Sequence, residues 1–291
     1  MDGIIIINKE KEWTSHDVVA KVKGITKSKV GHTGTLDPLA TGVLPLLLGK
    51  GTKLSKYLIE HDKIYEVELK LGVKTDTGDL EGNILEEENI DKDKLDKNLV
   101  KETLNSFIGE QIQTPPIYSA IKVKGKKLYE YARENKEVEI PKRKIKIFAI
   151  ELLNIEKENK KIKFKVHCSK GTYIRSLCED IAKKLGTIGY MSNLKRIVVG
   201  KFKIEDSIKI EELENNINNK EFMNNHFISI EKFFNGNKML ELDNETLQMF
   251  LNGVKLERKE NDGLYRIVSN SKFIGIGTIQ GGKLKRELIL D

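Results

Sequence analysis

Alternation of apolar and polar residues predicts β-strands along much of this chain. In 64–71 the alternation places Val67, Leu69 and Leu71 on one face. Tyr65 falls on that same face, so its ring should point inward or into a cleft. Other short apolar runs predict strands at 3–8, 145–155, 162–168 and 197–202. Because a polar turn joins the second and third of these runs, they should form an antiparallel pair.

Apolar residues at helical spacing predict helices between the strands. Ser15 is the expected N-cap of a helix over 15–25, and Thr52 is the expected N-cap of a short helix that follows it. Residues 170–172 should open a longer helix that ends near residue 185. Further helices are predicted at 91–107 and 127–133. This mixture of strands and helices predicts an α+β fold.

The composition of the chain changes beyond about residue 210. Residues 215–225 are rich in asparagine and predict a linker or a solvated helix. A small β-rich module should follow, with a helix at 244–251. Its four predicted strands are 238–242, 265–268, 273–279 and 285–290. A chain of 291 residues exceeds one ordinary core. We therefore expect two domains, 1–228 and 229–291.

The net charge of the chain indicates a polyanionic partner. The sequence is 38% apolar and 33% charged, with a formal net charge of +7. Such a surplus suits nucleic acid, although a lysine-rich proteome would also produce it. Two cysteines, Cys168 and Cys178, form neither a disulfide framework nor a zinc set. Without a signal peptide or an apolar run of about 18 residues, we expect a cytoplasmic protein and no membrane contact.

A glycine-rich stretch at 31–42 is the strongest candidate for a functional loop. Its glycines, threonines and proline prevent a regular helix. Pro38 should keep Asp37 extended at the head of a turn, and the apolar run 43–48 should hold the loop in a core. Asp37 could present an acid to a ligand, with His32 beside it. Alternatively, it could be an ordinary turn residue, because aspartate before proline commonly starts turns.

The familiar cofactor motifs are missing from the sequence. In 42–52, six residues rather than four separate the two glycines before the lysine, so this is not a Walker loop. The sequence contains neither a dinucleotide GxGxxG fingerprint nor HExxH. An enzyme with this sequence should therefore use side chains alone, with no cofactor and no metal.

A basic stretch at 122–146 could bind RNA. Ten lysines and arginines there are interleaved with Tyr129 and Tyr131, and Tyr118 precedes them. Cations neutralise phosphates, and aromatic rings stack on unpaired bases. Several glutamates in the stretch also allow a solvated charged face. Arg175, near a predicted helix start, could bind an anion or be an ordinary surface arginine.

Five stretches stand out in sequence order: Gly31–Gly42, Lys63-Ile64-Tyr65, Tyr118-Ser119-Ala120, Gly125–Arg133 and His167–Leu177. Taken together, they resemble the TruB-type tRNA pseudouridine synthases. This resemblance implies a pseudouridine synthase fold, with a mixed, mainly antiparallel sheet and flanking helices. It also implies that the chain isomerises uridine 55 in the T loop of tRNA. The tail resembles the small RNA-binding PUA domain.

The same resemblance implies roles for six residues. Asp37 would be the nucleophile and would attack either ribose C1′ or base C6 of the uridine. Because burial disfavours a charged carboxylate, a cationic neighbour is required, and by the resemblance this is Arg175. Tyr65 would stack on the base and relay the C5 proton. Tyr173 and Leu194 would contact the flipped uridine, and His32 would fill or prop the space that the base leaves.

We expect the partner to be the T arm of tRNA and the protein to be a monomer. Two other functions fit parts of the sequence. A non-catalytic tRNA-binding or tRNA-folding protein would use the same basic and aromatic surface. A small-molecule hydrolase could use Asp37 and His32, although it would explain neither the basic stretch nor the tail.

Overall fold

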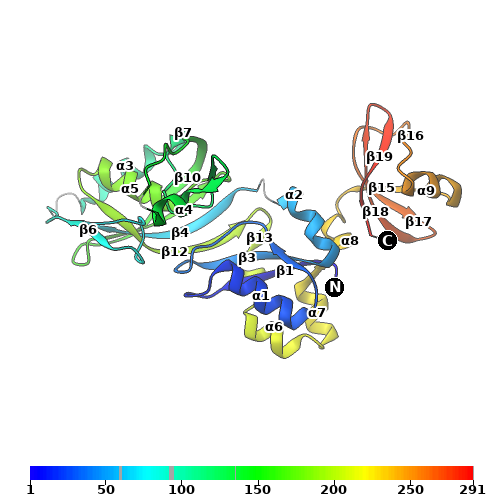
Figure 1. Ribbon diagram of the computed structural model, residues 1–291, viewed down its shortest axis with the longest axis horizontal. Helices are drawn as coiled ribbons and strands as arrows, with labels where there is room; N and C mark the ends of the chain where they lie inside the picture. Colours follow the sequence, from blue (N-terminus) through cyan, green and yellow to red (C-terminus); the bar gives the residue numbers. More distant parts are fainter. Residues whose placement is uncertain (59–60, 92–94, 135, 291) are drawn as a thin grey trace.

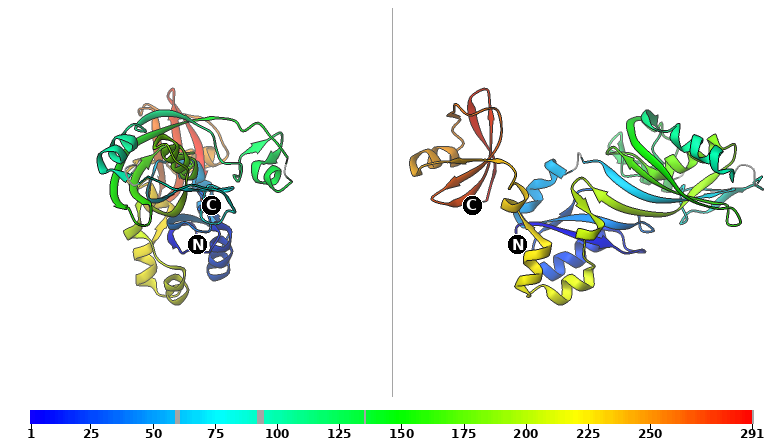
Figure 2. Two further views of the ribbon diagram at one scale, coloured as in Figure 1. Left: turned by 90° about the vertical axis from the view of Figure 1, so that its left-hand side faces the viewer. Right: turned by 180° about the vertical axis from the view of Figure 1, so that it is seen from behind.

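The computed structural model describes residues 1–58, 61–91, 95–134 and 136–290. One large twisted sheet with flanking helices forms most of the elongated molecule, and a small β-rich domain lies at the end that contains the C-terminus (Figure 1). Figure 2 shows the helical arm around α4 (Leu128–Arg133) projecting from the side of the large sheet. Among the described residues, no helix has the length and apolar character needed to cross a membrane.

The large sheet is mixed and mainly antiparallel, as predicted. Within the described residues it has ten strands, and one pair, β12 with β3, is parallel. The predicted antiparallel pair at 145–155 and 162–168 is confirmed as β10 and β11. The order across the sheet is β14 (Phe227–Ser229), β1 (Gly3–Lys9), β3 (Thr41–Leu48), β12 (Gly189–Val199), β4 (Lys63–Leu71), β11 (Lys161–Cys168), β10 (Arg143–Glu156) and β7 (Gly109–Gln113), with β2 (Val30–His32) on β3 and β13 (Phe202–Lys203) on β12.

Alternation along β1 distributes its side chains between two cores. Ile5 and Ile7 pack in the larger core, which also contains apolar residues of α1 (Ser15–Thr26), α3 (Lys97–Asn105), α5 (Ile174–Lys184) and α6 (Ile210–Asn216). Ile4 and Ile6 pack in a second core with α2 (Ser55–Leu58), α8 (Ile230–Phe233) and residues of the C-terminal domain. Because successive side chains of a strand point to opposite faces, β1 contributes to both cores and so connects the large sheet with the C-terminal domain.

The C-terminal domain confirms the predicted β-rich module. Within the described residues its five strands are ordered β15-β17-β18-β19-β16. The predicted helix at 244–251 is α9, with the predicted bounds. The elements are β15 (Lys238–Glu241), α9 (Asn244–Leu251), β16 (Leu256–Glu257), β17 (Gly263–Ser269), β18 (Lys272–Gln280) and β19 (Lys283–Ile289).

Two predicted helix caps are wrong. Thr14, not Ser15, is the N-cap of α1, where it forms a capping box with Asp17. The hydroxyl of Ser15 instead bonds the backbone of Leu36. Thr52 does not cap a helix, because it lies inside the 3-10 helix η1 (Gly49–Leu54) and its hydroxyl donates to the Gly49 carbonyl.

Other predicted boundaries move by several residues. The helix expected over 170–185 begins at Ile174, and the one expected over 91–107 is α3, whose N-cap is Asp96. Residues 92–94 of that prediction lie outside the described residues. The strand expected at 197–202 is the end of β12, a turn and β13. β12 begins at Gly189, where the residues lack a regular apolar alternation.

The remaining elements are short. The asparagine-rich segment forms the end of α6 and most of α7 (Lys220–His226), so the alternative of a helix is the correct one. A lysine-rich hairpin leads into the predicted helix at 127–133, which is α4. The other short elements are β5 (Val73–Thr75), β6 (Ile84–Glu87), β8 (Lys122–Val123), β9 (Lys126–Lys127), β14 (Phe227–Ser229) and the 3-10 helix η3 (Ile204–Asp206).

Candidate active site

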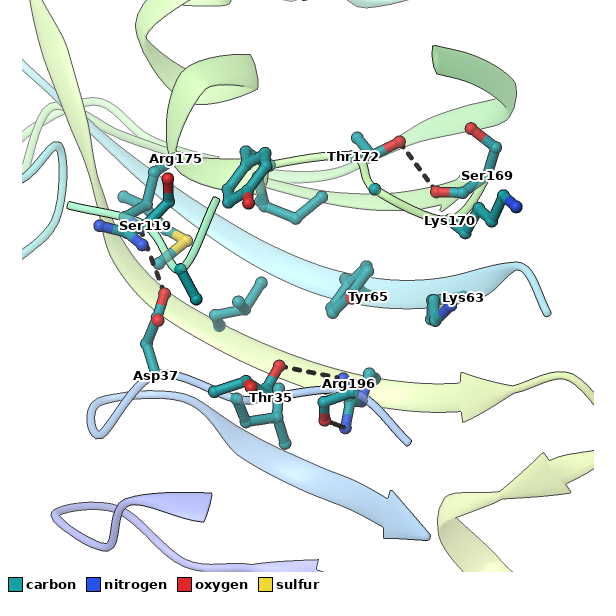
Figure 3. A pocket seen from close by; sticks show the side chains of 18 of the residues that line it. Thr35, Asp37, Lys63, Tyr65, Ser119, Ser169, Lys170, Thr172, Arg175 and Arg196 are labelled. Carbon is teal, nitrogen blue, oxygen red and sulfur yellow. Dashed lines mark hydrogen bonds and ion pairs between the residues drawn. The ribbon is translucent and has the colours of Figure 1, made fainter. Parts of the chain in front are cut away.

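A cleft of about 930 Å³ lies over the middle of the large sheet (Figure 3). Its walls come from the loop between β2 and β3, from β4 and β12, from the start of α5 and from residues 118–120. Segments far apart in the sequence therefore meet here. The candidate residues in its lining are Asp37, Tyr65, Tyr173, Arg175 and Leu194.

Asp37 stands at the head of a tight turn, as predicted. The backbone N–H of Ala40 donates to the Asp37 carbonyl at 3.0 Å, which closes a turn through Pro38. Leu36 and Leu39 on either side are buried in the larger core. The Asp37 side chain, in contrast, keeps 33% of its surface exposed and faces the cleft. The loop is thus fixed in the core and leaves its carboxylate accessible to a ligand.

Among the described residues, the side chains of Lys9, Ser15 and Arg196 form hydrogen bonds with the backbone of this loop. Ser15 accepts from the Leu36 N–H at 2.8 Å and donates to the Leu36 carbonyl at 3.0 Å. Lys9 donates to the Pro38 carbonyl at 3.0 Å. The residues directly before and after Asp37 are therefore both held, each by a different secondary-structure element.

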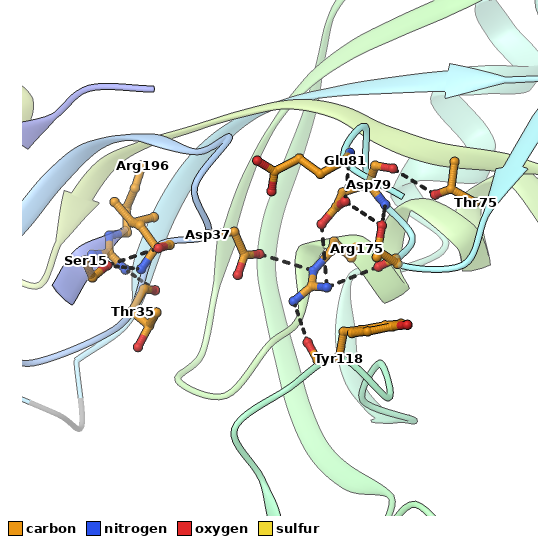
Figure 4. A network of polar contacts seen from close by, with 11 residues as sticks. Ser15, Thr35, Asp37, Thr75, Asp79, Glu81, Tyr118, Arg175 and Arg196 are labelled. Carbon is orange, nitrogen blue, oxygen red and sulfur yellow. Dashed lines mark hydrogen bonds and ion pairs between the residues drawn. The ribbon is translucent and has the colours of Figure 1, made fainter. Parts of the chain in front are cut away.

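Arg175 is the cation beside Asp37 (Figure 4). Its Nε lies 3.2 Å from Asp37 Oδ2, and its side chain is only 9% exposed. The two terminal nitrogens donate to the carbonyls of Thr77 and Tyr118, at 3.1 and 3.0 Å. The guanidinium is therefore fixed in one orientation and can stabilise an ionised Asp37.

A second carboxylate, Asp79, lies on the other side of Arg175. Asp79 Oδ2 is 3.6 Å from Arg175 Nη1, and the side chain is 5% exposed. Its other oxygen accepts from the Thr77 hydroxyl at 2.6 Å and from the Glu81 N–H at 3.1 Å. Burial raises the pKa of Asp79, and Arg175 opposes that shift. The sequence pattern gave no sign of this residue, because it lies in an ordinary turn-rich segment.

Tyr65 lies on the floor of the cleft, on the buried face of β4 as predicted. It is 8% exposed and lines the cleft near the loop that carries Asp37 (Figure 3). Burial raises the pKa of its hydroxyl, and the nearby guanidinium of Arg196 opposes that shift. Arg196 was also missed in the sequence, because it looks like one more basic residue among many.

Tyr173 and Leu194 complete the wall and floor. Tyr173 is the N-cap residue of α5, and its backbone makes two hydrogen bonds with the side chain of Gln113 at 2.8 and 3.0 Å. Leu194 is buried in β12 and also lines the cleft. Both residues add apolar surface to a cleft that also contains the Asp37–Arg175 ion pair.

His32 is the one candidate that does not line the cleft. It ends β2, half-buried, with its ring 6.5 Å from that of His16. Burial lowers the pKa of His32, and its Nδ1 has no hydrogen-bond partner among the described residues. A hydrolase that combines Asp37 with His32 is therefore not supported by the geometry.

Basic and aromatic side chains extend from the cleft onto the arm. Lys63, Arg143, Lys144 and Lys170 line the cleft, as does Tyr129 of α4. On the arm, cations lie over the tyrosine rings: Lys126 is 5.2 Å from the ring centre of Tyr131, and Lys127 and Arg133 are 5.2 and 5.3 Å from that of Tyr129. The predicted interleaving of basic and aromatic residues is thus a set of direct contacts. In the described part of the chain, no cluster of three or more His, Cys, Asp or Glu side chains could hold a metal.

The family of the chain follows from comparison with known protein families. A model described as TruB family pseudouridylate synthase (N terminal domain) matches residues 21–174. A model described as tRNA pseudouridylate synthase B C-terminal domain matches 175–235, and one described as Pseudouridine synthase II TruB, C-terminal, matches 239–287. The chain belongs to the TruB family of pseudouridylate synthases.

Relatives with this family's name match the chain from end to end. The tRNA pseudouridine synthase B of Clostridium kluyveri is 46% identical over 285 residues and covers 95% of each chain. The enzyme of that name from Aquifex aeolicus is 40% identical over 295 residues and covers 100% of each. A chain in the crystal structure of a Cbf5-Nop10-Gar1 complex superposes with a TM-score of 0.68 at 27% identity, covering 95% of this chain and 78% of that one.

Proposed function

We propose that this protein converts a uridine of tRNA to pseudouridine, the reaction that the names of its relatives state. The substrate position we propose is uridine 55 in the T loop. The observation that carries the proposal is the Asp37 carboxylate, held 3.2 Å from a buried guanidinium at the edge of a cleft with a tyrosine floor. Such a pair supplies a charged nucleophile beside a surface that can stack a base.

The chemistry needs no group beyond these side chains. Asp37 attacks the uridine at C1′ or at C6. By either route the C1′–N1 bond breaks, a C1′–C5 bond forms, the C5 proton leaves and N1 gains a proton. Asp37 is released unchanged. Because the target base starts inside a folded loop, it must first be flipped out, which costs a few kcal/mol of unstacking.

Each lining residue has a distinct role in this proposal. Arg175 stabilises the ionised Asp37 carboxylate. Tyr65 stacks on the flipped uracil, which recovers about 1–3 kcal/mol, and its hydroxyl relays the C5 proton. Tyr173 and Leu194 contact the nucleotide from the wall and the floor. His32 belongs to the glycine-rich stretch but does not line the cleft. From there it would prop the space that the base leaves in the tRNA.

The T arm is proposed to lie against the basic residues around the cleft. The lysines and arginines of 122–146, with their tyrosines, would bind its phosphates and unpaired bases. We assign catalysis to residues 1–228 and further RNA binding to a PUA-like domain at 229–291. We also propose that the protein acts as a monomer in the cytoplasm.

Position-resolved pseudouridine mapping tests this function. Unmodified total tRNA is incubated with the purified protein, and pseudouridine is located chemically along each tRNA. The proposal predicts one new pseudouridine at position 55 of T loops. Modification elsewhere would contradict the assigned position, and tRNA binding without any pseudouridine would favour the non-catalytic tRNA-binding or tRNA-folding alternative.

A further inference from the structure

Arg196 is a buried arginine whose guanidinium donates to backbone carbonyls on both sides of Asp37, in the loop and at the start of β3. It lies in β12 and is 2% exposed. Its Nη2 donates to the Gly34 carbonyl at 3.0 Å, and its Nη1 approaches the Thr35 carbonyl at 3.4 Å. Its Nε donates to the Val43 carbonyl at 2.8 Å. One guanidinium therefore joins the residues before Asp37 to the strand that follows the loop. Figure 4 shows Arg196 beside Thr35.

The backbones of β12 and β3 approach each other closely where the loop ends. Arg196 pairs with Gly42 in the parallel ladder, and Gly42 has a φ of +105°. A Cβ at Gly42 would lie 2.2 Å from the Arg196 carbonyl oxygen, so only glycine fits there. The backbones of β12 and β3 are therefore in contact at Arg196, the residue whose side chain bonds the loop.

Arg196 also reaches the floor of the cleft. Tyr65 is its cross-strand partner in β4, and the nearby guanidinium opposes the rise that burial causes in the pKa of the Tyr65 hydroxyl. Leu194, two residues earlier in β12, lines the cleft as well. A single buried cation therefore links the Asp37 loop to β12 and lies beside Tyr65 of β4.

A packing role alone does not account for a charge at this position. No carboxylate among the described residues forms an ion pair with Arg196. Three backbone carbonyls, with Tyr65 and the more distant Asp37, offset the loss of water around it. An apolar side chain of similar length would fill the same volume without that desolvation cost. The charge is best explained by what its donors hold in place.

We propose that Arg196 is a positioning residue, which fixes the Asp37 loop relative to Tyr65 and the floor of the cleft. The proposal rests on the function proposed above for Asp37. Arg196 itself lines the cleft. In this proposal it acts through the loop that it holds and not on the reacting atoms. It determines how far the carboxylate stands from the nucleotide, and a displacement of about 1 Å can slow an enzyme about 100-fold.

Two substitutions separate positioning from packing. Arg196→Met keeps the length and removes the donors, whereas Arg196→Lys keeps a charge and some donors. Lys195→Met is the matched control, because Lys195 is the adjacent residue of β12, is only half-buried and does not line the cleft. For each variant, the folded fraction is measured by circular dichroism, and kcat and KM are measured with a T-arm RNA.

The expected result is a split between kcat and KM. For Arg196→Met, kcat should fall about 100-fold while KM stays within about 3-fold of the unmodified protein. The kcat of Arg196→Lys should be at least about 10-fold higher than that of Arg196→Met. Lys195→Met should have the kinetic constants of the unmodified protein. The proposal is overturned if Met is as active as Lys, if the loss lies in KM, or if neither variant folds, since Arg196 would then be a structural residue only. An active Asp37→Asn variant would instead remove the proposed function itself.

Discussion

At the scale of single residues, the site depends on one guanidinium between two carboxylates. Arg175 is paired with Asp37 on the side of the cleft and with Asp79 on the buried side. Backbone carbonyls of Thr77 and Tyr118 accept from its two terminal nitrogens. The arginine therefore cannot turn away from Asp37 without breaking several bonds, which keeps the carboxylate and its counterion in a fixed geometry.

Arg175→Lys should be a severe change despite the conserved charge. A lysine ammonium is a point charge on a flexible stem and cannot reproduce the planar set of donors that meets Asp37, Thr77 and Tyr118 together. We expect turnover on T-arm RNA to fall about 100-fold while the affinity for RNA stays within about 3-fold.

Lys184→Ala is the control for this experiment, because Lys184 lies at the far end of the same helix, over the Phe107 ring. Single-turnover rates and filter binding measure the two properties separately. A rate for Arg175→Lys within about 3-fold of the unmodified protein would show that only the charge, not the geometry, is needed.

The sequence identified part of this arrangement. Asp37 could be found because glycines and a proline around an acid mark a rigid loop, and Tyr65 because the alternation in β4 turns it inward. Asp79 and Arg196 could not be found in this way. Their roles arise from contacts with residues 96 and more than 150 positions away in the chain, which local patterns do not encode.

At the scale of elements, α1 shows how two neighbouring hydroxyls divide two tasks. Thr14 caps the helix, and Ser15 bonds the Leu36 backbone inside the core. Both residues are good N-caps, so the sequence could not distinguish them. The choice is made by the tertiary contact, because burying Ser15 requires a partner that only the loop provides.

Two alanine substitutions should separate these tasks. Thr14→Ala should lower the unfolding free energy by about 1 kcal/mol, the usual cost of a lost N-cap, and leave turnover unchanged. Ser15→Ala leaves both polar groups of Leu36 without a partner next to Asp37, so it should lower turnover by about 10-fold or more. Urea unfolding and single-turnover rates measure the two effects. Equal losses of turnover in both variants would contradict the division.

At the scale of the whole molecule, two cores share the strands of one sheet. The alternation of β1 sends Ile5 and Ile7 to the core beneath the cleft and Ile4 and Ile6 to the core that reaches the C-terminal domain. The sequence predicted the strand and the β-rich tail, because both depend on local patterns. It did not predict that residues of the tail share a core with the same strand, because Ile4 lies more than 200 residues from Ile276 and Leu288.

The basic surplus of the chain should make RNA binding strongly dependent on salt. Each phosphate contact releases counterions, so the logarithm of the affinity falls linearly with the logarithm of the salt concentration. We expect the affinity for T-arm RNA to fall at least about 10-fold between 50 and 200 mM salt. Replacing Lys124, an exposed residue at the turn of the arm hairpin, with Ala should make the slope shallower by about one. A slope near zero in filter-binding titrations would contradict RNA binding by this surface.

The most direct test of the account is the activity of Asp37→Asn on T-arm RNA, measured together with RNA binding. Asparagine keeps the shape of the turn and cannot act as a charged nucleophile beside Arg175. The account predicts no pseudouridine in the product and an affinity for RNA close to that of the unmodified protein. Pseudouridine formed at a rate similar to that of the unmodified protein would contradict it.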